Sequence, residues 1–182
     1  MFSDTSYSSS KLFLLVFLGC ALFSLCFWSN FGLNLTWSSN PKCSNGFVPF
    51  EKTNSCYKLH QHNMSAMEAF EICFVQDSLP VSIINEEENN FVAGLHKASD
   101  ELSSTPESLW IGLINYEREW HWIYPTPLKY TNWAPGAPDE NFKDVMVKMV
   151  LGNGNKWKNV DPGDPGRMAM SDGVVCKKPM DS

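Results

Sequence analysis

The pattern of apolar residues marks residues 110–113, Trp-Ile-Gly-Leu, as the central strand of the fold. Three large apolar side chains around one glycine are typical of a strand that is buried on both faces. A glycine inside such a strand indicates that the backbone of another segment passes close above it. Residues 120–122 and 130–133 then place bulky rings at alternating positions, which is the period of a strand. We expect these segments to form an aromatic-rich β unit in the core.

Two segments have the period of an amphipathic helix. Ser65 followed by Glu68 is a capping box, and the apolar residues after it predict a helix that ends near Val75. Asn85 with Glu88 repeats the device ahead of a second apolar stripe, which predicts a second helix. Because acidic side chains in a first helical turn are explained by the macrodipole, we do not interpret those of the second helix as a metal site.

Shorter alternating segments predict the remaining strands. The spacing of Cys43 and Cys56 around a turn-like centre fits a hairpin. Further strands are predicted at residues 145–149, from residue 157 to 160, and at 174–176. Between them, residues 134–143 are rich in Pro, Gly, Asp and Asn, and residues 161–166 repeat Asp-Pro-Gly, so both segments are expected to be loops.

The amino-terminal part contains an uncharged apolar segment at residues 12–28. A signal peptide has an apolar region of roughly 7 to 15 residues, whereas a membrane-spanning helix needs roughly 17 to 25. Lys11 precedes the segment and no further positive charge occurs before Lys42, which favours an amino terminus in the cytosol. We favour an uncleaved type II signal anchor, with a cleaved signal peptide and secretion as the alternative. Both place the rest of the chain on the extracellular side.

Length and charge limit the classes of partner. The chain has 182 residues and a formal net charge of −6, without a run of Lys or Arg, which argues against nucleic acid and a polybasic membrane-surface partner. The membrane is therefore a partner only through the amino-terminal segment, if that segment is uncleaved. The predicted organisation is a short tail at 1–11, the apolar segment at 12–28, a polar stalk at 29–42 and one globular domain at 43–179.

Four cysteines lie in the predicted domain, Cys43, Cys56, Cys73 and Cys176. An even set on the extracellular side is expected to form disulfides, and four cysteines leave three pairings open. A zinc site is the rival interpretation, but the sequence has no CxxC or Cys/His cluster to support it.

Two tripeptides are N-glycosylation sequons, at Asn34 and Asn63. They have meaning only because the topology was inferred independently of them.

The assembled motifs carry a family resemblance. In chain order they are Cys56-Tyr57, Ala69-x3-Cys73, residues 110–113, Asn132-Trp133, Trp157 and Val175-Cys176. Their order and spacing resemble the C-type lectin-like domain in its long form, over residues 43–179. The resemblance implies an α+β fold, with two helices flanking antiparallel sheets and a long irregular loop region.

The resemblance also implies two disulfides, Cys43 with Cys56 and Cys73 with Cys176. Most members of this family have a further core bridge, whose matching positions here are Val145 and Pro162. Since both partners are missing together, no orphan thiol is left.

Sugar-binding members of this family hold calcium through a carboxylate-Pro-carboxamide or carboxamide-Pro-carboxylate triplet, a following Glu and an Asn-Asp pair. The matching positions here are Ala137-Pro138-Asp139, Lys143 and Lys158-Asn159. Calcium needs six to eight oxygen ligands, and two of these positions now bear ammonium groups that would repel it. We therefore expect no cofactor, and in particular no calcium at the usual sugar site.

Some oxygen donors remain. The weak metal candidates are Asp139, Glu140, Asp144 and Asn159. Glu140 and Asp144 match an accessory calcium site of the family, but without the rest of that shell we interpret them as a solvated loop face. The alternative is a calcium-dependent lectin in which Asp139, Glu140, Asp144 and Asp161 hold the ion in a shifted frame.

We expect the ligand-binding surface to lie in the loop at residues 134–143 and in residues 156–161. The candidate contact residues are Asp139, Asn141, Lys143, Lys156, Lys158 and Asn159. The expected partner is a glycan or a cell-surface or extracellular protein. The lysines would pair with acidic groups of that partner, or else form a solvated basic rim.

The sequence argues against an enzyme. His60 and His62 are predicted on one strand face, His96 at a helix end and His121 between two tryptophans. None of them has a nearby nucleophile and an orienting acid in a recognisable arrangement. We therefore expect a binding module.

Overall fold

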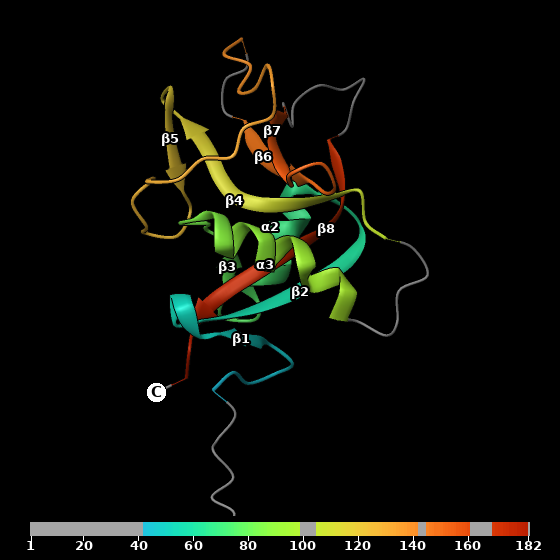
Figure 1. Ribbon diagram of the computed structural model, residues 1–182, viewed down its shortest axis with the longest axis vertical. Helices are drawn as coiled ribbons and strands as arrows, with labels where there is room; N and C mark the ends of the chain where they lie inside the picture. Colours follow the sequence, from blue (N-terminus) through green and yellow to red (C-terminus); the bar gives the residue numbers. More distant parts are fainter. Residues whose placement is uncertain (1–41, 99–104, 142–144, 161–168, 182) are drawn as a thin grey trace, which may run out of the picture. The chain divides into compact units, whose positions relative to one another are not determined.

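The computed structural model describes residues 42–98, 105–141, 145–160 and 169–181 (Figure 1). Within these residues it has an α+β fold, as expected from the sequence. In chain order the elements are β1 (Val48–Phe50), a 3-10 turn η1 (Glu51–Thr53), β2 (Ser55–Ser65), α2 (Ala66–Phe74), β3 (Leu79–Pro80), α3 (Glu86–Gly94), a 3-10 turn η2 (Leu95–Ala98), β4 (Ser108–Tyr116), β5 (Glu119–Trp122), β6 (Met146–Val150), β7 (Lys156–Val160) and β8 (Met170–Pro179).

The strands form one sheet with the order β1-β2-β8-β4-β6-β7, with β3 paired to β8 and β5 paired to β4. Every pairing is antiparallel except the contact of β4 with β8, which is a single parallel pair between Trp110 and Val174. The long pairing of β2 with β8 brings the two ends of the described domain together. The other half of the sheet, β4 to β7, bears the long loop.

The two halves are joined through Val81. Its amide donates to Val175 O of β8 over 2.8 Å, and its carbonyl accepts from Gly112 N of β4 over 2.8 Å. At this junction Pro80 O lies 2.4 Å from the position that a Cβ on Gly112 would occupy. The prediction that another backbone passes close above this glycine is therefore confirmed.

Alternation along β4 and β8 separates the core into two clusters. Leu109, Ile111 and Val175 belong to a cluster that includes Val92 of α3. Trp110, Val174 and Cys176 belong to a second cluster that includes Ala66, Ala69 and Cys73 of α2. Since successive strand residues point to opposite faces, the two helices cover opposite faces of the sheet, as the resemblance implied.

Both helices begin where the capping patterns predict. Ser65 Oγ accepts from Glu68 N over 3.2 Å ahead of α2, and Asn85 Oδ1 accepts from Glu88 N over 2.8 Å ahead of α3. Such side-chain acceptors satisfy amides that have no partner inside the helix.

Glu88 has a role that the sequence did not reveal. Its side chain is fully buried, and Oε1 accepts from Lys177 Nζ over 2.6 Å and from Tyr57 Oη over 2.6 Å. Oε2 accepts from Ile84 N over 2.8 Å. Burial, followed by the charge of Glu88, raises the pKa of the Tyr57 hydroxyl far above its ordinary value. This buried ion pair links α3 to β8 and β2.

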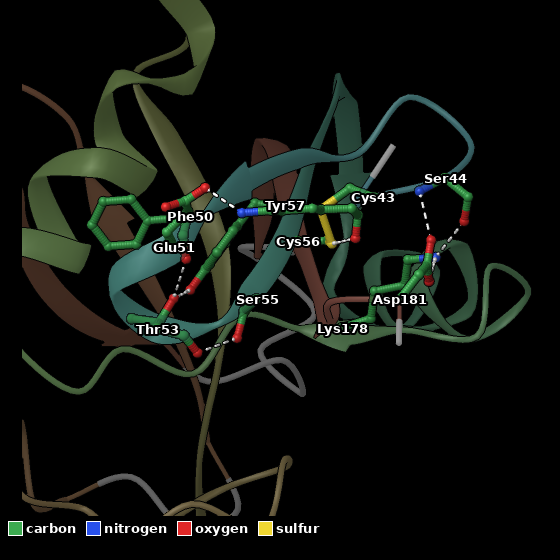
Figure 2. Close-up of a disulfide and its surroundings, with 11 residues drawn as sticks. Cys43, Ser44, Phe50, Glu51, Thr53, Ser55, Cys56, Tyr57, Lys178 and Asp181 are labelled. Atoms are coloured by element: carbon green, nitrogen blue, oxygen red, sulfur yellow. Dashed lines mark hydrogen bonds and ion pairs between the residues drawn. A yellow bond between two sulfur atoms is a disulfide. The ribbon is translucent and has the colours of Figure 1, made fainter. Parts of the chain in front are cut away.

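The disulfides pair as the resemblance implied, Cys43 with Cys56 and Cys73 with Cys176. Figure 2 shows the first bridge beside the carboxyl-terminal residues, where Ser44 N donates to Asp181 Oδ2 over 3.0 Å. The second bridge spans 103 residues and links α2 to β8. In the loop-closure model a bridge of this length stabilises the fold by roughly 4 to 5 kcal/mol.

One predicted strand is wrong. Residues 130–133 form no strand, and only Trp133 makes an isolated parallel bridge, with Trp157. The backbone of this segment meets β7 only around Trp157, through two hydrogen bonds, and so short a pairing makes a bridge and not a strand. The aromatic rings of this segment still reach the core.

Several predictions fall outside the described residues. They concern the segments at 1–11, 12–28 and 29–41, together with Asn34, Lys143, Asp144, Asp161 and Pro162. No helix in the described part of the chain combines the length and the apolar character that crossing a bilayer requires. The signal anchor therefore stays a prediction.

Replacing Gly112 by Ala is expected to lower the free energy of unfolding by about 3 kcal/mol or more, because the new methyl group would meet the Pro80 carbonyl. The matched control is Gly94→Ala in α3, where a Cβ has no atom within 4 Å. That control should leave stability unchanged or raise it by up to about 1 kcal/mol. Urea unfolding of both variants measures the difference, and equal stabilities would contradict the close approach.

Replacing Lys177 by Met is expected to lower the free energy of unfolding by about 3 to 5 kcal/mol, because Glu88 would stay buried without its cation. The double variant Lys177→Met/Glu88→Gln removes both charges and should recover most of that loss. Chemical denaturation of the two variants and the parent gives the coupling energy. If the double variant is no more stable than Lys177→Met, the ion pair does not have this role.

Candidate functional site

The loop that follows Trp133 is attached to the outer edge of β7, the last strand of the sheet. Trp157 N donates to Asn132 O over 2.8 Å, and Ala134 N donates to Trp157 O over 2.9 Å. Asn132 also donates through Nδ2 to Gly154 O over 2.9 Å. These contacts fix where the loop starts relative to the strand.

Aromatic rings form a rigid base under this loop. The ring of Trp157 is fully buried and packs edge-on against Trp122, Tyr130 and Trp133, with centroid distances of 5.6, 5.6 and 5.9 Å. Its Nε1 donates to Asn89 Oδ1 of α3 over 2.8 Å. Burial raises the pKa of the Tyr130 hydroxyl above its ordinary value. The rings serve packing, as the sequence indicated.

A pair of hydrogen bonds between Asn159 and Asp139 closes the loop onto the end of β7. Asn159 Oδ1 accepts from Asp139 N over 2.8 Å, and Asn159 Nδ2 donates to Asp139 O over 2.9 Å. Asn159 is buried, with 8% of its surface exposed. We call this pair of hydrogen bonds the amide clamp.

The Asp139 carboxylate is occupied within the loop itself. Its Oδ1 accepts from Asn141 N over 3.0 Å and from Asn141 Nδ2 over 2.8 Å. A cation in the frame used by sugar-binding members would therefore have to displace amide donors from both Asp139 and Asn159. Glu140 is exposed beside them.

The structure divides the candidate contact residues between two places. It brings Asp139, Asn141 and Asn159 together, whereas Lys158 is exposed next to a buried Asn159 and so points to the opposite face of β7. Lys156 Nζ donates to Asn132 Oδ1 over 2.6 Å. The prediction that the ammonium group of Lys158 helps to keep calcium away stays a prediction.

Histidines and acids do not gather in the described part of the chain. There, no three His, Cys, Asp or Glu residues lie close enough to hold a metal ion. His60 contacts Gln76 Nε2 over 2.9 Å, and His62 contacts Glu68 Oε1 over 3.2 Å. The two imidazole rings, predicted on one strand face, therefore have different partners. Burial, followed by the charge of Lys58, lowers the pKa of His60.

The second sequon lies on the surface. Asn63 is exposed near the end of β2, where the pairing with β8 shifts register between Gln61 and Met64. Its modification stays a prediction.

Sequence reasoning missed one residue, Lys148 of β6, whose place beside Lys158 depends on strand register.

Comparison with known families agrees with this geometry. The family model described as the lectin C-type domain matches residues 62–165. Human C-type mannose receptor 2 is 28% identical over 156 residues, which cover 82% of this chain. Mouse lithostathine-1 is 30% identical over 125 residues, which cover 66% of this chain and 71% of that protein. The chain matches only 10% of the length of the mannose receptor.

Solved structures show the same fold. The carbohydrate-recognition domain of cow CD23, crystallised in the presence of a GlcNAc2Man3 oligosaccharide, superposes with a TM-score of 0.60 at 27% identity. The match covers 77% of this chain and 98% of that domain. The α+β fold and its long loop region are therefore those of this family of structures.

Replacing Asn159 by Ala is expected to open the loop, because the backbone amide and carbonyl of Asp139 would both lose their hydrogen-bond partners. We expect a loss of about 1 to 3 kcal/mol in the local stability of this segment. Hydrogen exchange at the Asp139 amide measures it. The control Asn141→Ala removes an exposed contact to the same residue and should leave that amide protected. Equal exchange in Asn159→Ala and the parent would contradict the clamp.

Proposed function

Because the chain belongs to the C-type lectin family, we propose that it is an extracellular binding module that recognises a glycan or a protein without a bridging calcium ion. The observation that supports this proposal is the amide clamp, which uses the oxygen of Asn159 and the backbone of Asp139 to close the loop. In this proposal hydrogen bonds hold the loop in the shape that an ion would otherwise impose. The chain acts by binding and not by catalysis.

The ligand chemistry supports the same proposal. Calcium requires six to eight oxygens, several of them carboxylates. At the matching triplet the chain offers Ala137 in place of the first oxygen donor, and the Asp139 carboxylate already accepts two hydrogen bonds from Asn141. Calcium would have to displace these amides and would then gain one carboxylate and one carboxamide, far fewer oxygens than it requires, so calcium is not expected to enter.

An extracellular location is supported by the cysteines. The described domain holds two disulfides, one of them across 103 residues, and such bridges persist in oxidising compartments. We propose that residues 12–28 anchor the chain as a type II membrane protein, with secretion as the alternative. Glycans at Asn34 and Asn63 would be consistent with either topology.

Carbohydrate is a credible class of ligand because of the relatives. The matched cow CD23 domain was crystallised with an oligosaccharide, and the mannose receptor is named for a sugar. For this chain, we propose that contacts come from the loop residues Asp139 to Asn141, of which Glu140 and Asn141 are exposed, and from the lysines of β7.

A binding screen on the full-length chain in mild detergent tests the proposal. Immobilised glycans and protein ectodomains are probed once with millimolar calcium and once with a chelator. We expect the same ligands to be retained in both conditions, with affinities that agree within about twofold. Retention that the chelator abolishes would contradict the proposal and favour the alternative, a calcium-dependent lectin with displaced carboxylates.

A further inference from the structure

The outward face of β6 and β7 bears a pair of lysines directly opposite each other. In the antiparallel register Lys148 of β6 pairs with Lys158 of β7. Val147 and Asn159 alternate with them and are buried, so both lysines point away from the cluster around Trp157. Opposed residues in such a pair have Cβ atoms about 5 Å apart. We call Lys148 and Lys158 the lysine pair.

Within the described residues, no carboxylate neutralises this pair. Lys148 Nζ donates only to a backbone carbonyl, Met170 O, over 3.3 Å. Lys158 is exposed, and neither lysine has a carboxylate of the described residues within salt-bridge distance. By contrast, Lys42 and Lys52 pair with Glu51 and Glu87.

Like charges directly opposite on neighbouring strands destabilise a sheet. The bond to Met170 O also limits the freedom of Lys148 to swing away. Among the described residues this positive charge has no carboxylate partner, and it is held at one place on the surface. We propose that the lysine pair binds a sulfate group of a sulfated glycan, which extends the proposed function by naming the class of its ligand.

The sheet favours a compact anionic group over an extended acidic peptide. β6 is bonded on one side to β4 and on the other to β7. The outer edge of β7 is bonded to Asn132 and Ala134. Since the amide and the carbonyl of Trp157 are both already bonded at this edge, a peptide cannot add as a strand along it. A ligand must approach from above the face, where its charge meets two ammonium groups.

The chemistry of lysine supports sulfate over a planar carboxylate. An ammonium is a compact point charge with freely rotating donors, whereas planar bidentate recognition of carboxylates is the speciality of Arg. Three sulfate oxygens can accept from two ammonium groups at once. Because the chain has a net charge of −6, it has no general attraction to polyanions. Binding of a sulfate group would therefore depend on the local charge of this pair.

The test uses the full-length chain in mild detergent, with chelator present throughout. A heparin-derived sulfated hexasaccharide, its desulfated form and a poly-glutamate peptide are titrated into the parent and into Lys148→Gln/Lys158→Gln. The control is Lys129→Gln, which removes one exposed charge that lies on neither β6 nor β7. We expect the double variant to bind the sulfated hexasaccharide about a hundredfold more weakly, or roughly tenfold for each lysine. The control should stay within about twofold, and the desulfated form should not bind.

Three results would overturn the inference. They are no binding of the sulfated hexasaccharide to the parent, equal loss in the control and the double variant, and tighter binding of poly-glutamate. None of these results touches the proposed function, which fails only if ligand retention requires calcium. Unchanged circular dichroism and unfolding midpoints in the double variant show that a loss of binding is not a loss of fold.

Discussion

The bridge of Val81 between β8 and β4 is the constraint on which the rest of this fold depends. The amide of Val81 donates to the carbonyl of Val175, and its carbonyl accepts from the amide of Gly112, each over 2.8 Å. It inserts where β4 and β8 diverge after their single parallel pair. The half of the sheet that pairs the chain ends is thereby joined to the half that bears the loop. Only glycine at position 112 leaves room for the Pro80 carbonyl, so the missing side chain lets this segment approach β4 closely enough to bond to it.

The recognition surface inherits its rigidity from this junction. β4 positions β6, β6 positions β7, and β7 holds the loop through Trp157 and the amide clamp. Every link in this series is a protein hydrogen bond or a packed ring. In the proposed account the loop needs no ion to define its shape, and the lysine pair on the outward face of β6 and β7 recognises the charge of the ligand.

Local sequence signals predicted the local structure well. Ser65 and Asn85 mark the starts of both helices, because a cap is decided within a few residues, and Gly112 marked the close approach. The disulfide pairing was available only through the family resemblance. Non-local features were missed. Sequence alone indicated only that Glu88 is an acid in a first helical turn, because its partner Lys177 lies 89 residues away in the chain. Residues 130–133 have the composition of a strand, but nothing in them reveals that their backbone meets β7 only around Trp157. The pairing of Lys148 with Lys158 requires the register, which a one-residue slip would change.

The central claim is that the amide clamp has taken over the structural role of an ion. Isothermal titration of calcium into the full-length chain, in the same detergent, tests it most directly. We predict no heat of binding up to millimolar calcium, both in the parent and in Lys158→Gln, because Asp139 Oδ1 and Asn159 Oδ1 already accept hydrogen bonds within the loop. A saturable heat with a micromolar to millimolar dissociation constant, lost in Asp139→Ala, would contradict it.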